Sequence, residues 1–172
     1  MSASVLGVDP GVSETGWAVL EAADGAPRLM ASGLVKTYPE TEFPERLTFL
    51  HSSLAALIEE HEPSSMAIEE MFFMKAAHTI RKTLQARGVL ILAAAQRGLP
   101  IREYNPRTIK LSLTGSGQAK KPQIQSAVKR ALGLSDILRP DDVSDAAAIA
   151  LCHLRSERSS RLRVLERHGA RA

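Results

Sequence analysis

The sequence predicts an α/β fold in which helices pack on both faces of a five-stranded mixed sheet. Three strand-like segments joined by short turns come first, and two further strand-like segments each follow a segment with helical periodicity. The chain has 172 residues, 44% of them hydrophobic and 24% charged, which suffices for one domain with a buried core. We place this domain at residues 1–155.

The first three strands are expected to form an antiparallel meander. Pro10 and Gly11 end the first strand, and the turn-forming sequence DGAP at residues 24–27 separates the second strand from the third. Apolar and β-branched residues concentrate in the three segments, which are residues 4–9, 16–21 and 29–36.

The spacing of apolar residues becomes helical after Pro44 and stays so as far as residue 62. A second, long helical pattern covers residues 76–97. The strands that follow these helices, at residues 66–69 and within 98–104, are expected to extend the sheet in parallel because helical crossovers join them. Further helices are predicted from Asn105-Pro106, at 122–132 and at 143–154.

The C-terminal residues 156–172 are predicted to form a basic tail outside the domain. Residues 155–172 contain six arginines and two glutamates and lack apolar periodicity. We therefore expect this segment to be mobile rather than part of the core.

Several features are typical of a protein of the reducing cytoplasm. The one cysteine, Cys152, cannot form an internal disulfide. The N-terminal sequence MSASVLGVDPG lacks the basic start and the apolar stretch of a secretory signal. No apolar run approaches the roughly 18–20 residues of a membrane span. We expect a cytoplasmic protein that does not interact with membranes.

Charge is distributed unevenly along the chain, although the net charge is only +3. Residues 1–74 sum to −9, whereas residues 75–130 sum to +11 and contain a single acidic residue, Glu103. A basic segment of this strength indicates a polyanion held on one face. The alternative is that folding spreads these charges around the surface, and charge alone does not decide between the two.

Four carboxylates occupy positions that suit a metal site. Asp9 and Glu69 each end a predicted strand, while Asp142 and Asp145 lie three residues apart on one side of the last helix. If the first and fourth strands are parallel neighbours, all four side chains meet at one edge of the sheet. Their mutual repulsion then favours bound cations, and oxygen ligands without His or Cys favour Mg²⁺ or Mn²⁺.

Two such ions in each subunit suit the hydrolysis of a phosphodiester, because one activates water and the other stabilises the leaving oxygen. Each carboxylate also has a purely structural interpretation. Asp142 and Asp145 can cap their helix, Asp9 can hydrogen-bond its own turn, and Glu69 can be a solvated strand end. The set of four together is better explained by metal binding.

Four stretches of the sequence resemble, in the expected order, the Holliday-junction resolvases of the RuvC type. They are VLGVDPGVSETGWAV, AIEEMFFMK, the long stretch from LQARGV to KKPQIQ, and DDVSDAAAIAL, and the resemblance covers residues 4–155. It implies an RNase H-like fold, a homodimer, and cleavage of two strands of a four-way DNA junction with Mg²⁺ or Mn²⁺. It also implies a role in DNA recombination and repair beside the RuvA and RuvB branch-migration proteins.

The resemblance implies roles for individual residues. Lys110 and Lys121 match basic positions near the scissile phosphate, and Phe72 matches an aromatic residue that contacts bases at the junction centre. Asp142 is the most replaceable acid, because some relatives have His at that position. The full set matching the family's metal-binding acids is Asp9, Glu69, Asp142 and Asp145.

The residues themselves are compatible with DNA binding. Lys110 and Lys121 flank two glycines, so a flexible loop can bring their charge to a phosphate, although a solvated lysine-rich turn is the alternative. Phe72 and Phe73 can stack on unpaired bases, and we expect Phe73 to be the more buried of the two. The basic segment supplies three further candidate DNA contacts, Lys75, Arg81 and Lys120.

Three other functions stay open from the sequence. One is a nuclease of the same fold that cleaves RNA–DNA hybrids or other branched nucleic acids. Another is an ATP-binding phosphotransferase, suggested by GVDPG at residues 7–11, although these enzymes need two lobes and a much longer chain. The last is a junction-binding module without catalysis. For the dimer, the helix at residues 76–97 is the candidate contact, because it has more apolar surface than one sheet face needs.

Overall fold

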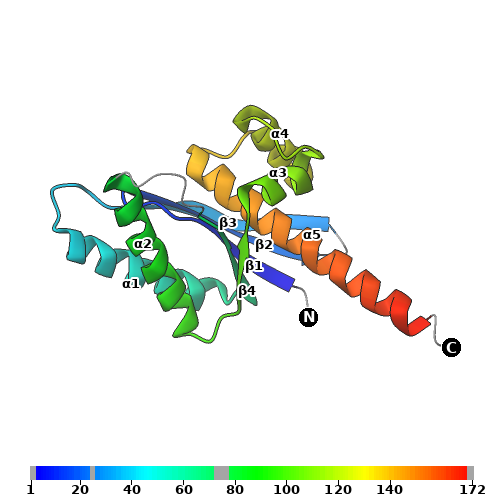
Figure 1. Ribbon diagram of the computed structural model, residues 1–172, viewed down its shortest axis with the longest axis horizontal. Helices are drawn as coiled ribbons and strands as arrows, with labels where there is room; N and C mark the ends of the chain where they lie inside the picture. The colour runs from blue at the N-terminus through cyan, green and yellow to red at the C-terminus, as the bar shows by residue number, and fades with distance from the viewer. Residues whose placement is uncertain (1–2, 24–25, 72–77, 170–172) are drawn as a thin grey trace.

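The computed structural model describes residues 3–23, 26–71 and 78–169. This part of the chain forms one sheet in the strand order β3-β2-β1-β4-β5 with helices on both sides (Figure 1). The strands are β1 (Ala3–Asp9), β2 (Glu14–Ala23), β3 (Ala26–Lys36), β4 (Ser65–Glu69) and β5 (Ile101–Tyr104). The helices are α1 (Phe43–His61), α2 (His78–Ala95), α3 (Pro106–Thr114), α4 (Lys121–Leu132) and α5 (Asp141–Gly169).

The central strand β1 pairs antiparallel with one neighbour and parallel with the other. β1 with β2 and β2 with β3 form the antiparallel meander. β1 with β4 and β4 with β5 are parallel, as the helical crossovers require. The predicted α/β fold, with three antiparallel strands extended by two parallel ones, is therefore confirmed.

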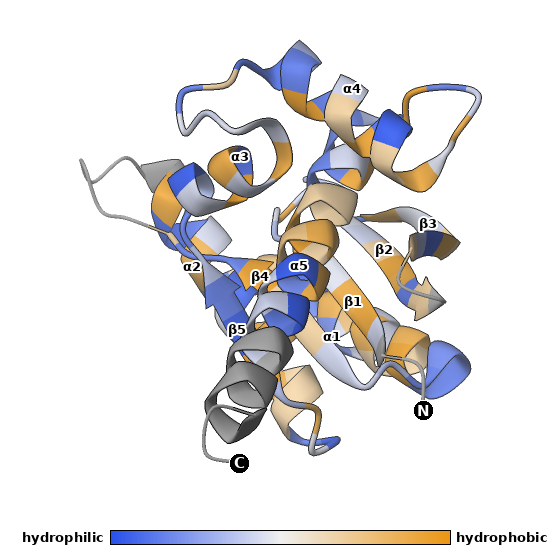
Figure 2. Ribbon diagram, turned by 90° about the vertical axis from the view of Figure 1, so that its right-hand side faces the viewer, coloured by the Kyte–Doolittle hydropathy of each residue, from blue (hydrophilic) through white to orange (hydrophobic). Residues whose placement is uncertain are grey.

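The two faces of the sheet are covered by different helices (Figure 1). Side chains alternate along β1, so that Leu6 and Val8 pack with α1 and α2, whereas Val5 packs with α3, α4 and α5. Figure 2 shows α3 and α4 beside the beginning of α5. The segments that carry the basic residues after residue 105 therefore gather at one end of the α5 face.

Two glycines allow α5 to approach the sheet closely. A Cβ atom on Gly7 would lie 2.2 Å from the backbone oxygen of Ala146, and one on Gly16 would lie 2.0 Å from the backbone oxygen of Asp142. Ala146 and Ala150 on the helix are fully buried. These small residues place α5 directly on β1 and β2, with its first turn above Gly16.

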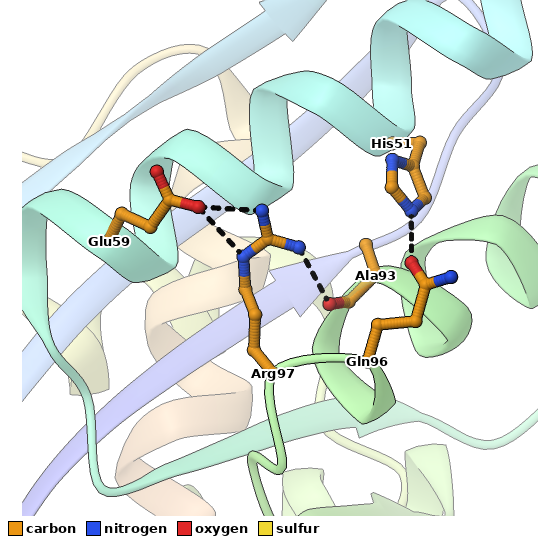
Figure 3. A network of polar contacts seen from close by, with 5 residues as sticks. All are labelled: His51, Glu59, Ala93, Gln96 and Arg97. Atoms are coloured by element: carbon orange, nitrogen blue, oxygen red, sulfur yellow. Dashed lines mark hydrogen bonds and ion pairs between the residues drawn. The ribbon is translucent and has the colours of Figure 1, made fainter.

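Polar contacts join α1 to the end of α2 on the other face. His51 Nε2 lies 2.7 Å from Gln96 Oε1 (Figure 3). The Arg97 guanidinium binds Glu59 Oε1 through Nε at 3.2 Å and Nη2 at 2.7 Å, and also donates to the Ala93 carbonyl. Because α1 leads into β4 and α2 leads into β5, this network lies at the amino ends of these strands.

The last helix is longer than predicted. We expected it to end at residue 154, but α5 continues to Gly169, so the boundary at residue 155 falls inside a helix. The apolar periodicity does stop at Leu154, and the sequence beyond it contains good helix formers such as Arg, Glu and Leu. The separation of residues 156–172 from the domain stays a prediction. Despite its 29 residues, α5 is not apolar enough to cross a membrane, and neither is any other described helix.

Candidate active site

Asp9 and Glu69 lie at the carboxyl ends of two neighbouring parallel strands. The register pairs Val8 on β1 with Ile68 on β4, so the next residue on each strand is a carboxylate. Val8 and Ile68 pack on the α1–α2 side, and the alternation of the strand turns Asp9 and Glu69 to the α5 side. The condition set by the sequence, that the first and fourth strands be parallel neighbours, is met.

The first turn of α5 brings two more carboxylates to this place. Gly16 lies opposite Asp9 in the β1–β2 register, and the backbone of Asp142 rests on Gly16. The helix therefore begins above the end of β1. Asp142 and Asp145, three residues apart, face the same side of its first turn.

A cavity of about 230 Å³ lies where these elements meet. Its walls combine the ends of β1 and β4 with the inner sides of α3, α4 and α5, and its apolar lining includes Ile109, Ile124 and Ile149. Five predicted site residues line it, namely Asp9, Glu69, Lys110, Lys121 and Asp145.

The acids in and beside the cavity influence one another's protonation, although Asp142, the sixth predicted catalytic residue, is not among the residues that line it. Burial, together with Asp145, Glu69 and Asp142, raises the pKa of the Asp9 carboxyl from 3.8 to about 7. Burial and the charge of Asp145 also raise the pKa of Glu69, while Lys110 opposes them. Burial raises the pKa of Asp145 although Lys121 lowers it. The site thus holds more negative charge than its own lysines balance.

Lys121 lies between two aspartates at the start of α5. Its Nζ is 3.2 Å from Asp141 Oδ2 and 3.2 Å from Asp145 Oδ2. Partial burial lowers the pKa of Lys121, but hydrogen bonds and charge from the two aspartates outweigh it and raise the pKa overall. Asp141 also accepts hydrogen bonds from Gln125 at 2.9 Å and Arg139 at 3.0 Å. Asp141 is not among the residues predicted from the sequence, where its only signal is the doublet with Asp142.

The turn after Asp9 is held by a buried arginine that the sequence analysis also missed. Arg46 on α1 is 6% exposed. It donates from Nε to Thr37 Oγ1 at 2.8 Å and from Nη2 to Ser13 Oγ at 3.0 Å. The Thr37 hydroxyl in turn donates to the Val12 carbonyl at 2.6 Å. These bonds fix the chain directly beyond Asp9.

The model of the family "Crossover junction endodeoxyribonuclease RuvC" matches residues 5–153 of the chain. The chain belongs to the RuvC family. The matched residues include both strand ends and the first turn of α5, so the match covers the whole cavity.

Individual relatives agree with this assignment. A crossover junction endodeoxyribonuclease RuvC of Roseiflexus sp. is 45% identical over 148 residues, which are 86% of this chain and 88% of the relative. The Thermus thermophilus RuvC structure covers 91% of this chain and 96% of its own, with a TM-score of 0.84 and 32% identity. The structure of T. thermophilus RuvC in complex with Holliday junction substrate has a TM-score of 0.83, 30% identity and the same coverage of both chains.

The RuvC membership confirms three predictions: the resolvase family, the RNase H-like fold, and an endonuclease that resolves Holliday junctions in recombination and repair. The other functions considered from the sequence are not favoured. As RuvC-type nucleases depend on metal, the donor set of the cavity has to suit a metal ion.

The chemistry of the cavity fits a hard divalent cation. Its candidate ligands are carboxylate oxygens, which Mg²⁺ and Mn²⁺ prefer. Burial and the neighbouring carboxylates raise the pKa of Asp9 to about 7, and a bound cation would stabilise its ionised form against both effects. Within the described residues, no three Asp, Glu, His or Cys side chains stand in a ready-made metal-binding arrangement. Lys121 provides positive charge beside Asp145 instead.

The remaining predicted DNA contacts lie in different places. Lys120 is exposed directly before α4, beside the cavity residue Lys121. Lys110 belongs to α3 and Lys121 to α4, so neither lies in the loop with Gly115 and Gly117. Arg81 is exposed on α2, which packs on the opposite face, and does not line the cavity. Three further predicted contacts, Phe72, Phe73 and Lys75, lie outside the described residues.

Proposed function

We propose that Asp9, Glu69, Asp142 and Asp145 hold two Mg²⁺ or Mn²⁺ ions in each subunit, and that a homodimer uses two such sites to make paired, symmetric nicks in a four-way junction. The observation that carries this proposal is the convergence of β1, β4 and α5 on one acidic cavity that two lysines also line. A nuclease for two equivalent strands is served by a two-fold dimer with one site in each subunit.

The chain's own residues have separate tasks in the proposed reaction. When bound, the two ions supply an activated water and stabilise the leaving oxygen. Asp9 and Glu69 hold their carboxylates in fixed positions, because both residues lie at the ends of hydrogen-bonded strands. Lys110 and Lys121 line the same cavity, so their ammonium groups can balance the charge that develops on the scissile phosphate.

The proposed DNA surface joins the cavity to the basic segment. Lys120 is exposed beside the cavity, where it can bind a phosphate. We assign contacts to bases or phosphates near the cut to Phe72, Phe73 and Lys75, because they follow Glu69 closely in the sequence. We also propose α2 as the dimer contact, where Leu92 is 50% exposed. A cytoplasmic location beside the RuvA and RuvB branch-migration proteins completes the proposed assignment.

The test uses a synthetic four-way junction labelled on opposing strands, incubated with Mg²⁺, Mn²⁺ or Ca²⁺. We expect symmetric nicks with Mg²⁺ or Mn²⁺, and no cleavage by Asp9→Asn, which removes a ligand but still binds the junction. Asp136→Asn, which removes an exposed carboxylate outside the cavity, serves as the matched control. Cleavage by Asp9→Asn at the wild-type rate would refute the proposed metal site.

A further inference from the structure

The backbone of Glu69 is held by a side chain from the opposite face of the sheet. Arg87, in the middle of α2, donates from Nε to the Glu69 carbonyl at 3.1 Å. Its Nη2 forms an ion pair with the carboxylate of Glu103 on β5. The Arg87 side chain is 14% exposed and that of Glu103 is 48% exposed. Arg87 therefore joins α2 to β4 and β5 at one point.

This point lies at the same end of the sheet as the acidic cavity. In the parallel β4–β5 register, Glu103 lies opposite Ile68 and Tyr104 lies opposite Glu69. The β1–β4 register ends one residue earlier, with Val8 opposite Ile68. Glu69 is thus paired on the β5 side only, and Arg87 supplies a further fixed point for its backbone.

The charges of the pair indicate that Arg87 binds groups of the protein itself rather than DNA. Glu103 is the single acidic residue between residues 75 and 130, a segment that otherwise sums to +11. A lone carboxylate there weakens the attraction for a polyanion, so a benefit elsewhere has to account for its presence. That benefit is the Arg87 guanidinium, which Glu103 neutralises and orients.

We propose that Arg87 is a positioning residue for junction cleavage, which fixes the backbone of Glu69 and is itself fixed by Glu103. The inference rests on the proposed role of Glu69 as a metal ligand. Ligands from different elements can share an ion only if each is held within about 0.5 Å of its place. Groups that orient metal ligands contribute about 10–100-fold to metal affinity or activity.

Substitutions of this pair separate positioning from DNA binding. We expect Arg87→Gln to lower the single-turnover cleavage rate at saturating protein by about 10–100-fold and to raise the Mn²⁺ concentration for half-maximal rate. The Kd for the junction, measured in Ca²⁺, should stay close to the wild-type value. Glu103→Gln should lower the rate less, and the double variant should be no slower than Arg87→Gln, because Glu103 acts through Arg87. Arg87→Lys keeps one donor and should restore part of the rate.

The pair of Arg97 and Glu59 provides a matched control. It also joins an arginine beside α2 to a glutamate and a backbone carbonyl, but at the amino ends of the parallel strands (Figure 3). Arg97→Gln should lower the melting temperature without lowering the cleavage rate. Equal cleavage losses in Arg87→Gln and Arg97→Gln would overturn the positioning role. A weakened Kd with a full rate at saturating protein would overturn it too, because Arg87 would then be a DNA contact.

Glu69→Gln distinguishes failure of this inference from failure of the proposed site. If Glu69→Gln is inactive and Arg87→Gln cleaves at the wild-type rate, the positioning role is wrong and the proposed site stands. If Glu69→Gln cleaves normally, the proposed site itself is wrong. Should Arg87→Gln not fold, the same measurements are made on Arg87→Lys and on Glu103→Gln, since the side chain of Glu103 is half-exposed.

Discussion

Gly16 and Asp142 are in direct contact: a Cβ atom on Gly16 would lie 2.0 Å from the backbone oxygen of Asp142. Because Gly16 is also opposite Asp9 in the β1–β2 register, this contact sets the separation between the first turn of α5 and the end of β1. The arrangement of the acidic cavity therefore depends on a residue that has no side chain and carries no charge.

Gly16→Ala should lower both stability and cleavage. The obstructing atom belongs to the helix backbone, so α5 has to move, and overpacking of this kind lowers the free energy of unfolding by about 1–3 kcal/mol. The shift also carries Asp142 and Asp145 away from Asp9, so the cleavage rate should fall well below that of the wild type at temperatures where the variant is folded. Chemical denaturation and single-turnover cleavage measure the two effects.

Gly33→Ala is the control for this substitution. Its added methyl group would meet the side chain of Trp17, at 2.8 Å, rather than a backbone atom near the cavity. It should cost stability and leave cleavage unchanged. If Gly16→Ala cleaves as fast as Gly33→Ala, the contact with Asp142 does not determine the geometry of the site.

Asp141 and Asp145 should differ in importance although both bind Lys121. The charge of Asp145 acts on Asp9 inside the cavity, whereas Asp141 does not act on Asp9. The oxygens of Asp141 instead bind Lys121, Gln125 and Arg139. We expect Asp145→Asn to abolish cleavage and Asp141→Asn to slow it several-fold at most, because Asp141→Asn weakens its ion pairs with Lys121 and Arg139 without removing a carboxylate from the cavity. A quantitative cleavage assay in Mn²⁺ compares them, and equal loss in the two variants would contradict the assignment.

Ser144 should be a site where a smaller side chain stabilises the protein. Its hydroxyl is the buried side-chain polar atom that lacks a hydrogen-bond partner among the described residues. Removing an unsatisfied polar group is worth about 1–3 kcal/mol. Ser144→Ala should therefore raise the midpoint of urea denaturation by more than Ser126→Ala, which alters an exposed serine in α4 and shows the effect of helix propensity alone. An equal effect of the two would mean that the Ser144 hydroxyl is satisfied.

The carboxylates at the strand ends were predictable because the signals are local. The apolar run that stops at Asp9 before Pro10 identifies one strand end, and the apolar run that stops at Glu69 identifies another. Parallel neighbours bring their carboxyl ends together whatever the rest of the chain does. The pairing of β1 with β4 was only a condition in the sequence analysis, because sheet order leaves no periodic pattern, and the register of the structure meets that condition.

The supporting residues were not predictable because their partners are distant in sequence. Arg46 contacts Ser13, and Arg87 contacts Glu69 and Glu103, without any periodic pattern that marks them. The charge pattern did single out Glu103, but not its partner. Apolar periodicity likewise placed the end of the last helix at residue 154, since residues with good helix propensity can extend a helix without an apolar face.

The raised pKa of Asp9 should make the stability of the metal-free protein depend on pH. Below pH 3.8 the Asp9 carboxyl is protonated in both the folded and the unfolded chain, so its titration contributes nothing unfavourable. Between that pH and about 7 the unfolded chain releases the proton while the folded chain retains it, so the free energy of unfolding falls as the pH rises. At about 1.4 kcal/mol per pKa unit the loss amounts to roughly 4 kcal/mol, and it is complete above the folded pKa.

Asp9→Asn removes this titration and should be more stable than the wild type in EDTA at pH 8, with the difference shrinking towards pH 4. Divalent metal should make the wild type more stable than Asp9→Asn. Mn²⁺ stabilises the ionised Asp9 of the wild type, whereas the variant lacks this ligand. The gain in melting temperature with Mn²⁺ should therefore be larger at pH 8 than at pH 6 in the wild type and small at both in Asp9→Asn. Thermal denaturation at constant protein concentration measures all four values. A wild type as stable as Asp9→Asn in EDTA at pH 8 would mean that the ionised Asp9 is neither desolvated nor repelled by its neighbours, which would contradict a shared acidic cavity.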